Sequence, residues 1–224
     1  MDPRVVARLE ALNAEFYDRV AADFSATRQS PWPGWHRVLE RAGPVRSVLD
    51  VGCGNGRFAA LLPDDVEYVG VDPCAALLAE VPPHHETLLG GWSERPWGTR
   101  TFDLVVAFGL THHVASAARR RALISTLRAA SHGRVAVTAW RFDPARAVGW
   151  DGVPAEALED GDYFLGFGHG DAVRYCHLVS DAELEGWFDD VLDDFVSDGR
   201  DGASNRYCVG SGASSRSNGS IRRR

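Results

Sequence analysis

The stretch VLDVGCGNG, from Val48 to Gly56, decides the fold of this chain. It is an apolar run that contains an acid, Asp50, and then places three glycines at alternate positions. A continuous apolar run is typical of a strand buried on both faces of a parallel sheet. Glycines at alternate positions let the backbone turn sharply and approach a ligand closely. The stretch therefore predicts a buried parallel strand that turns, beside a ligand, into a helix.

The segments around this stretch alternate in the same way. Strands are predicted at 47–51, 66–72, 85–91, 102–109 and 134–140, and helices between them at 57–63, 73–81 and 118–130. Extended segments at 173–179, 193–198 and 205–211 follow, with a short helix at 181–190. Strands that alternate with helices indicate an α/β fold, with a mostly parallel sheet covered by helices on both faces.

The chain divides into three parts. Residues 1–44 hold an amphipathic helix, a proline-rich turn that ends it and a second short helix that stops at Gly43, and we interpret this segment as a helical lid. Residues 45–210 form the α/β domain, in which 142–170 is a glycine- and aspartate-rich variable insertion. Residues 211–224 have the composition of a disordered tail.

Composition restricts the classes of function. The formal net charge is −7, and all 24 basic residues are arginine, which suits the gripping of carboxylates or phosphates but leaves no basic excess for a simple nucleic-acid binder. The four cysteines occur singly, without a C-x-x-C pair, so we predict reduced thiols and no metal site. The sequence shows no apolar run of membrane-spanning length and no secretory leader, so we expect a cytoplasmic protein without membrane attachment.

The glycine turn predicts a nucleotide site. Asp72 ends the second strand, 22 residues after Asp50, where a carboxylate can accept both hydroxyl protons of a ribose. A dinucleotide fingerprint would place the third glycine one residue later, as G-x-G-x-x-G. The spacing G-x-G-x-G, with an acid two residues before it, instead resembles the first motif of class I S-adenosylmethionine-dependent methyltransferases. That resemblance implies a Rossmann-like fold with seven strands and S-adenosylmethionine as cofactor.

In that family Asp50 and the glycine loop hold the amino-acid end of S-adenosylmethionine, and a residue after the third strand meets adenine; here that position falls near Trp92. The expected cofactor-binding residues are Tyr17, Asp50, Gly52, Cys53, Gly54, Asp72, Pro73, Trp92 and Phe108.

The segment EFYDRVAADFSATRQSPWP, residues 15–33, carries a more specific resemblance. It matches the N-terminal signature Y-(D/E)-x-(I/V)-A-x-x-F-S-x-T-R-x-x-P-W-P of the methyltransferases that esterify 5-carboxymethyluridine at the tRNA wobble position. AFGLTHHV, VRYCHLVSDAELEGWF and NRYCV are similar to later segments of that family, so that the resemblance spans residues 14–209. It implies a tRNA substrate and, since members commonly work with one, a small zinc-binding partner protein.

A carboxylate acceptor is ionised at neutral pH and needs a positioning cation rather than a base. Arg28, Arg174 and His112 are our candidates for the catalytic machinery. The candidates for substrate binding are Trp32, which would stack on a base, and His113, Tyr175 and His177. Structural alternatives stay open. Trp32 could be core packing, Arg28 a surface helix cap and Tyr175 packing, and His112 or His113 could be a structural hydrogen-bonding residue.

Three functions remain. The first is esterification of a carboxylate on a modified tRNA wobble uridine, the second is methylation of a small metabolite, and the third is cofactor binding without catalysis in support of a partner.

Overall fold

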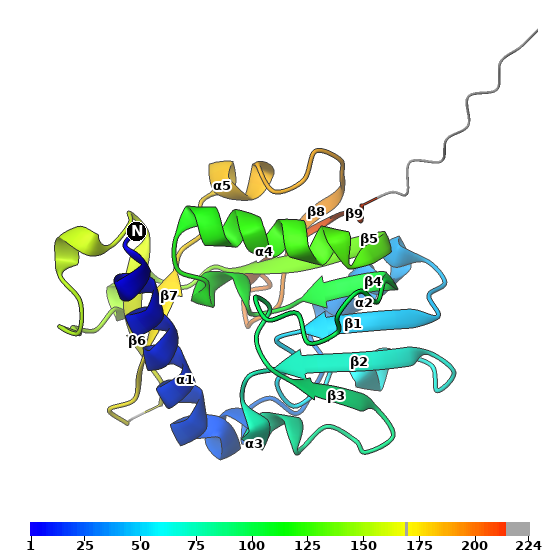
Figure 1. Ribbon diagram of the computed structural model, residues 1–224, viewed down its shortest axis with the longest axis horizontal. Helices are drawn as coiled ribbons and strands as arrows, with labels where there is room; N and C mark the ends of the chain where they lie inside the picture. Colours follow the sequence, from blue (N-terminus) through cyan, green and yellow to red (C-terminus); the bar gives the residue numbers. More distant parts are fainter. Residues whose placement is uncertain (169, 214–224) are drawn as a thin grey trace, which may run out of the picture.

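A seven-stranded sheet forms the centre of the molecule (Figure 1). The computed structural model describes residues 1–168 and 170–213. The strands lie in the order β3-β2-β1-β4-β5-β9-β8, and only β9 runs antiparallel to its neighbours. Their bounds are β1 Ser47–Val51, β2 Glu67–Asp72, β3 Glu86–Leu89, β4 Phe102–Ala107, β5 Ser131–Trp140, β8 Val191–Ser197 and β9 Asn205–Ser211. The predicted Rossmann-like fold with a mostly parallel seven-stranded sheet is therefore confirmed.

Alternate residues of the central strands pack on opposite faces of the sheet. Leu49 and Val105 belong to a cluster with α4 (Ala117–Ala129), which also takes in Leu184 of α5 (Asp181–Glu185). Val48 and Leu104 face the other way, toward Trp35 of α2 (Pro33–Ala42). Helices therefore cover both faces, which explains the continuous apolar character of the strands.

The helix α1 (Pro3–Ala26) packs outside the main sheet (Figure 1). Its partner is a two-stranded antiparallel sheet of β6 (Asp162–Gly166) and β7 (Val173–His177). The predicted insertion at 142–170 thus supplies a strand, together with two short 3-10 turns, η3 (Pro144–Arg146) and η4 (Ala155–Ala157). Together, α1 and this hairpin wall one side of the edge where the parallel strands end.

Two predicted helices are much shorter in the structure. The helix expected at 57–63 is a single 3-10 turn, η1 (Ala59–Leu61), because Gly56 and Pro63 leave too few residues between them for a stable helix. The helix expected at 73–81 is the four-residue α3 (Ala75–Leu78).

Ser211, which belongs both to the predicted extended segment 205–211 and to the predicted tail, is the last residue of β9. Most of the predicted tail, residues 214–224, lies outside the described residues. Within the part of the chain that the structure describes, no helix combines the length and apolarity needed to cross a membrane.

Candidate active site

A cavity of about 870 Å³ opens where the parallel strands end. Its walls come from α1, from the turn before α2, and from the loops that follow β1, β2, β3 and β4. A volume of this size accommodates a ligand as large as a nucleoside cofactor. Of the predicted site residues, all except Tyr175 and His177 line this cavity.

The glycine turn after β1 adopts the backbone that the sequence predicts. Gly52 and Gly54 have φ values of 78° and 56°, a region that favours glycine over residues with a Cβ. The Gly54 amide donates a hydrogen bond to one carboxylate oxygen of Asp72 at 2.9 Å, and the Cys74 amide donates to the other at 2.9 Å. Asp72 is therefore held in place by two backbone donors, and each oxygen keeps a lone pair for a ligand hydroxyl.

Asp50 is a buried carboxylate whose charge is stabilised by few hydrogen bonds. It is 3% exposed, and its hydrogen-bond donor in the described part of the chain is the Tyr68 hydroxyl at 2.9 Å. Burial raises the pKa of Asp50 to about 7, even though the Tyr68 hydrogen bond opposes the rise. A carboxylate in this position gains most from a cationic ligand group such as an ammonium. The donor set therefore fits the amino acid end of S-adenosylmethionine at Asp50 and its ribose at Asp72.

The other end of the cavity holds cations that have no counterion among the residues that the structure describes. Arg174 of β7 is 6% exposed, and its guanidinium carbon lies 4.9 Å from the ring centre of Phe16 and 5.1 Å from that of Trp140. Its Nε atom has no hydrogen-bond partner in the structure. Arg28 lies over the ring of Phe24 at 4.5 Å.

No ion pair among residues 1–168 and 170–213 involves either arginine. Burial lowers the pKa of Arg28, and the nearby charge of Arg174 lowers it further. Arg174 is buried and Arg28 is half-buried, and two such guanidinium groups that repel each other gain most from a shared anionic ligand, because a charge removed from water is costly without a partner.

The hydrogen bonds of His113 fix its tautomer. Its Nδ1 atom lies 2.9 Å from the Tyr175 carbonyl oxygen, which can only accept, so Nδ1 carries the proton. Nε2 therefore accepts from the Tyr17 hydroxyl at 2.8 Å. Burial lowers the pKa of His113 to about 3 and raises that of Tyr17 to about 12. We conclude that His113 lines the cavity as a neutral residue that positions Tyr17.

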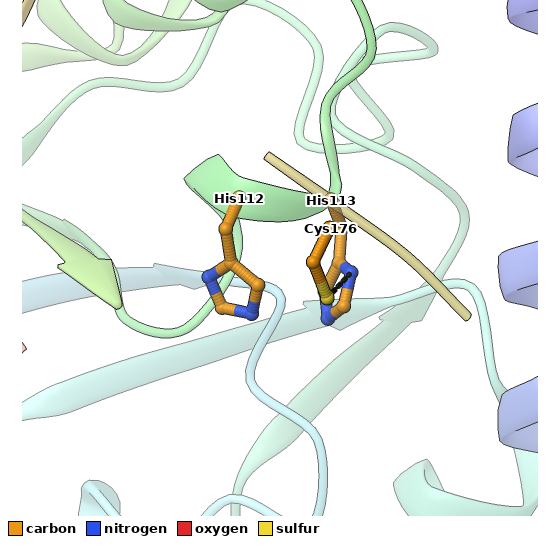
Figure 2. A group of neighbouring side chains, drawn as sticks. All are labelled: His112, His113 and Cys176. Atoms are coloured by element: carbon orange, nitrogen blue, oxygen red, sulfur yellow. Dashed lines mark hydrogen bonds between the residues drawn. The ribbon is translucent and has the colours of Figure 1, made fainter. Parts of the chain in front are cut away.

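His112 projects from the same 3-10 turn, η2 (Thr111–His113), beside His113 (Figure 2). It is buried, and its Nδ1 atom has no hydrogen-bond partner in the structure. Burial lowers the pKa of His112 well below its usual value, and the charge of Arg174 acts in the same direction. His112 is therefore a neutral hydrogen-bonding group that faces the cavity.

Donor atoms of His112, His113 and Cys176 lie within 4.8 Å of one another, which is a spacing that a metal ion could bridge (Figure 2). Two observations disfavour a cation there. Both nitrogens of His113 already have hydrogen-bond partners, and the guanidinium of Arg174 lies close enough to depress the pKa of both histidines. We assign His112 and His113 to the wall of the cavity, whereas Cys176 is fully buried and does not line it.

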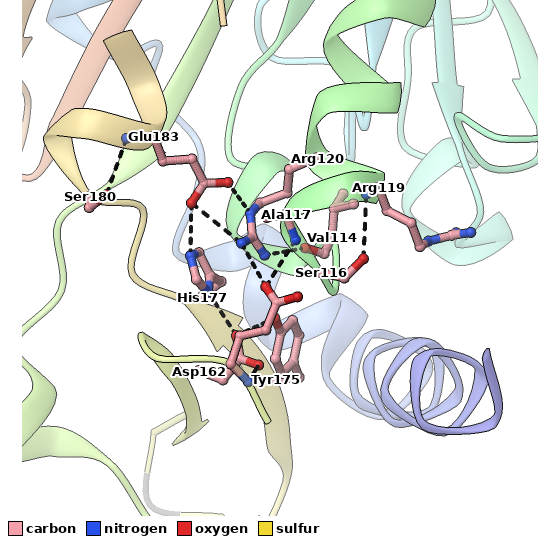
Figure 3. A network of polar contacts seen from close by, with 11 residues as sticks. Val114, Ser116, Ala117, Arg119, Arg120, Asp162, Tyr175, His177, Ser180 and Glu183 are labelled. Carbon is pink, nitrogen blue, oxygen red and sulfur yellow. Dashed lines mark hydrogen bonds and ion pairs between the residues drawn. The ribbon is translucent and has the colours of Figure 1, made fainter. Parts of the chain in front are cut away.

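Tyr175 and His177 are corrections to the predicted substrate-binding set. Figure 3 shows both side chains in a polar network, and neither residue lines the cavity. The Tyr175 hydroxyl donates to Asp162 at 2.6 Å, and the two His177 nitrogens lie 2.7 Å from Asp162 and 3.1 Å from Glu183. Arg120 donates to Glu183 at 2.5 Å, which completes the network. Their side-chain polar atoms join the β6–β7 hairpin to α4 and α5.

The cavity wall also contains residues that the sequence-based set did not include, among them Asn13, Arg57, Trp140 and Asn205. Asn13 gave a signal, since it is a polar residue on the apolar face of α1; its Oδ1 accepts from the Tyr175 amide at 2.8 Å. Arg57 directly follows the glycine turn. Trp140 and Asn205 gave no signal in the sequence, because they become neighbours only through the antiparallel pairing of β5 with β9.

Comparisons with known proteins agree with this geometry. A family model described as "Methyltransferase domain" matches residues 26–191. The tRNA (carboxymethyluridine(34)-5-O)-methyltransferase of Saccharomyces cerevisiae is 30% identical over 135 residues, which cover 57% of this chain and 47% of that protein. The protein of the same name from Schizosaccharomyces pombe is 31% identical over 107 residues, or 47% of this chain and 46% of that protein. The chain spans about half the length of these curated relatives.

Among solved structures, the CcbJ methyltransferase of Streptomyces caelestis has a TM-score of 0.65 at 16% identity, covering 90% of this chain and 99% of that one. This structural similarity supports the fold assignment alone. The family match covers most of the chain, and its residues include the glycine turn, Asp50 and Asp72 that fit the cofactor. The chain therefore belongs to the methyltransferase-domain family, and the domain it carries is of the S-adenosylmethionine-dependent kind.

Proposed function

We propose that this protein transfers a methyl group from S-adenosylmethionine to the carboxylate of a carboxymethylated wobble uridine in tRNA. One observation carries the proposal: Arg174 and Arg28 face the cavity without a counterion in the described part of the chain. An ionised carboxylate is the acceptor that two such cations favour. The relatives named as tRNA (carboxymethyluridine(34)-5-O)-methyltransferases support the choice of that carboxylate.

The chemistry needs alignment more than proton transfer. S-adenosylmethionine, when bound, supplies a methyl group on an electrophilic sulfonium. A carboxylate, with an intrinsic pKa of about 4, is already ionised at neutral pH. Arg174 and Arg28 would hold its oxygens in line with the methyl group, which is the main requirement of a displacement reaction. Asp50 and Asp72 would hold the cofactor at its two ends.

The neighbouring groups agree with an acceptor that needs no base. The pKa of His113 is lowered to about 3, and its nitrogens are occupied by Tyr17 and the Tyr175 carbonyl. The pKa of Tyr17 is raised to about 12 by burial, so its hydroxyl keeps its proton. His112 would donate or accept a hydrogen bond as a neutral side chain. A hydroxyl acceptor would need a general base, and the lowered pKa values of His112 and His113 make both histidines weak bases.

Trp32 supplies an aromatic surface at the cavity mouth. It is half-buried and lies against Trp35, with ring centres 5.4 Å apart. Aromatic side chains of this kind stack on unstacked bases of single-stranded RNA loops. Its role as a base-stacking residue stays a prediction, as does the zinc-binding partner protein.

A second candidate is esterification of a carboxylate on a small metabolite. The net charge of −7 favours it, because binding to an RNA backbone usually draws on a basic surface. The two functions share the cavity and differ in what surrounds the carboxylate.

Incubation with labelled S-adenosylmethionine separates the two. Bulk tRNA should take up label that mild base removes, as expected for a methyl ester. The Arg174→Met variant should lose this labelling, whereas Arg121→Met, which changes an exposed residue of α4, should keep it. Labelling confined to a small-molecule extract would contradict the tRNA assignment. Nucleosides of a deletion strain should then accumulate the free acid, as seen by mass spectrometry.

A further inference from the structure

Asn205, the first residue of β9, has a buried oxygen atom without a partner. The side chain is 2% exposed and lines the cavity. Its Nδ2 atom donates to a carboxylate oxygen of Asp198 at 2.9 Å. Because that carboxylate can only accept, the amide orientation is fixed, and Oδ1 is the unpartnered atom. A buried hydrogen-bond acceptor without a donor indicates that a ligand supplies the donor when it binds.

The surroundings hold this amide rigidly. Asp198 is 3% exposed and also accepts hydrogen bonds from the Gly34 amide at 2.9 Å and from the Tyr207 hydroxyl. These donors come from α2 and β9, two elements that pack on each other. Asn205 therefore cannot turn to satisfy its oxygen without breaking its bond to Asp198.

A cation lies at the same end of the cavity. The Arg57 guanidinium lies over Trp32 at 4.6 Å and over Trp35 at 4.9 Å, and its Nη1 atom donates to the Ser30 carbonyl at 3.0 Å. Burial and the charge of Arg28 together lower the pKa of Arg57 to about 10, while Asp198 acts in the opposite direction. Like Arg28 and Arg174, Arg57 forms no ion pair among the described residues, although it is close enough to Asp198 to feel its charge.

We propose that Arg57, Asn205 and Trp32 form a subsite for a planar heterocycle whose edge places an N–H donor beside a carbonyl oxygen, as in a uracil-type base. Asn205 Oδ1 would accept from the ring N–H. Arg57, which lies over the Trp32 ring at 4.6 Å, would turn to donate to the adjacent carbonyl and so free the Trp32 face to stack on the ring. A phosphate fits less well, because it would leave the Asn205 oxygen without a donor. The inference rests on the proposed function, since it describes the base that carries the carboxylate.

The test changes the ligand and leaves the protein intact. Two synthetic anticodon stem-loops would carry 5-carboxymethyluridine or its N3-methylated counterpart, which lacks the ring donor. Binding would be measured by fluorescence anisotropy with S-adenosylhomocysteine present, and methyl transfer would be measured separately. N3-methylation should weaken binding by about 10-fold or more, because it leaves the Asn205 oxygen unpaired. Equal binding of the two RNAs, or binding of neither, would overturn the subsite.

A second pair of stem-loops separates this inference from the proposed function. If uridine and 3-methyluridine loops differ in binding while no RNA is methylated, the subsite stands and the carboxylate assignment fails. If both carboxymethylated loops bind and are methylated equally, the carboxylate assignment stands and the subsite fails.

Protein variants add an independent readout. Arg57→Gln should weaken binding of the carboxymethylated loop by at least about fivefold while the Kd for S-adenosylmethionine stays within about twofold. Arg4→Gln, at an exposed position of α1, is the matched control and should bind like the wild type. A variant at Arg57 that loses affinity for S-adenosylmethionine instead would show that Arg57 serves the cofactor, and would overturn its place in the subsite.

Discussion

Replacing Asp50 with asparagine should weaken cofactor binding and stabilise the protein. The substitution keeps the shape of the side chain and leaves an oxygen for the Tyr68 hydroxyl, which lies 2.9 Å from the carboxylate. It removes the charge that would meet the ammonium of S-adenosylmethionine. Hydrogen bonds to charged groups contribute about 1.5–3 kcal/mol, so the Kd should rise by about 10- to 150-fold.

The effect on stability has the opposite sign. Burial raises the pKa of Asp50 to about 7 in the folded protein, from about 4 in an unfolded chain. Because the folded state binds this proton more tightly than the unfolded state, the stability that the proton adds to the fold is complete below about pH 4. That stability is lost progressively as the pH rises through 7. At pH 8 the ionised wild-type carboxylate is thus destabilising by up to about 4 kcal/mol, on the order of 1.4 kcal/mol for each pKa unit. Asparagine removes that penalty.

Two measurements test this pair of effects. Isothermal titration calorimetry at pH 8 gives the Kd for S-adenosylmethionine, and thermal melts of the ligand-free protein at about pH 5 and pH 8 give the stability. The Asp50→Asn variant should melt higher than the wild type at pH 8, and this difference should shrink at pH 5. An unchanged Kd would refute the placement of the ammonium at Asp50. A variant that melts lower than the wild type at pH 8 would refute the burial argument.

Three further predictions concern the acceptor end and the polar network. Arg174→Met should reduce methyl transfer by at least about 100-fold with little change in Kd for S-adenosylmethionine, since it removes the cation that aligns the acceptor; steady-state kinetics and calorimetry separate the two. Tyr17→Phe should lower kcat by about 3- to 30-fold while thermal melts stay close to the wild type, because one hydrogen bond with His113 is lost. Burial disfavours the charged form of His177, but the hydrogen bonds to Asp162 and Glu183 outweigh burial and raise the pKa of His177. The stability of the wild type should therefore fall as the pH rises from about 6.5 through that raised pKa. His177→Gln should flatten this part of the melting profile, and an unchanged slope would contradict the assignment.

The sequence was most informative where a local pattern has one structural meaning. The glycine turn with Asp50 and Asp72 predicted the sheet edge and the cofactor end, because the backbone there needs glycine and because the strands end in acids. The same reasoning overestimated the helices after β1 and β2. Alanine and leucine favour a helix, yet Gly56 and Pro63 close the first segment, and the second has helical backbone only from Ala75 to Leu78. Asn205 could not be placed, because its site depends on how β9 pairs with β5.

The strand β7 shows why the acceptor residues were only partly identified. Successive side chains of a strand point to opposite faces, so that Arg174 and Cys176 share one face while Tyr175 and His177 share the other. The motif that includes all four residues has no feature that tells which face meets the cavity. The structure places Arg174 toward the cavity and gives the opposite face to the network around Asp162.

These two faces depend on each other. A buried arginine without a counterion is unfavourable, and the strand that carries it must be held by other interactions. The aromatic rings of Phe16 and Trp140 partly compensate the charge of Arg174, and the hydrogen bonds of Tyr175 and His177 fasten the strand to α4 and α5 through Arg120 and Glu183. We infer that the network keeps Arg174 unpaired and ready for an anion. Loss of His177 should therefore raise the KM for the acceptor more than it raises the Kd for S-adenosylmethionine, and equal effects on both would show that the network only supports the fold.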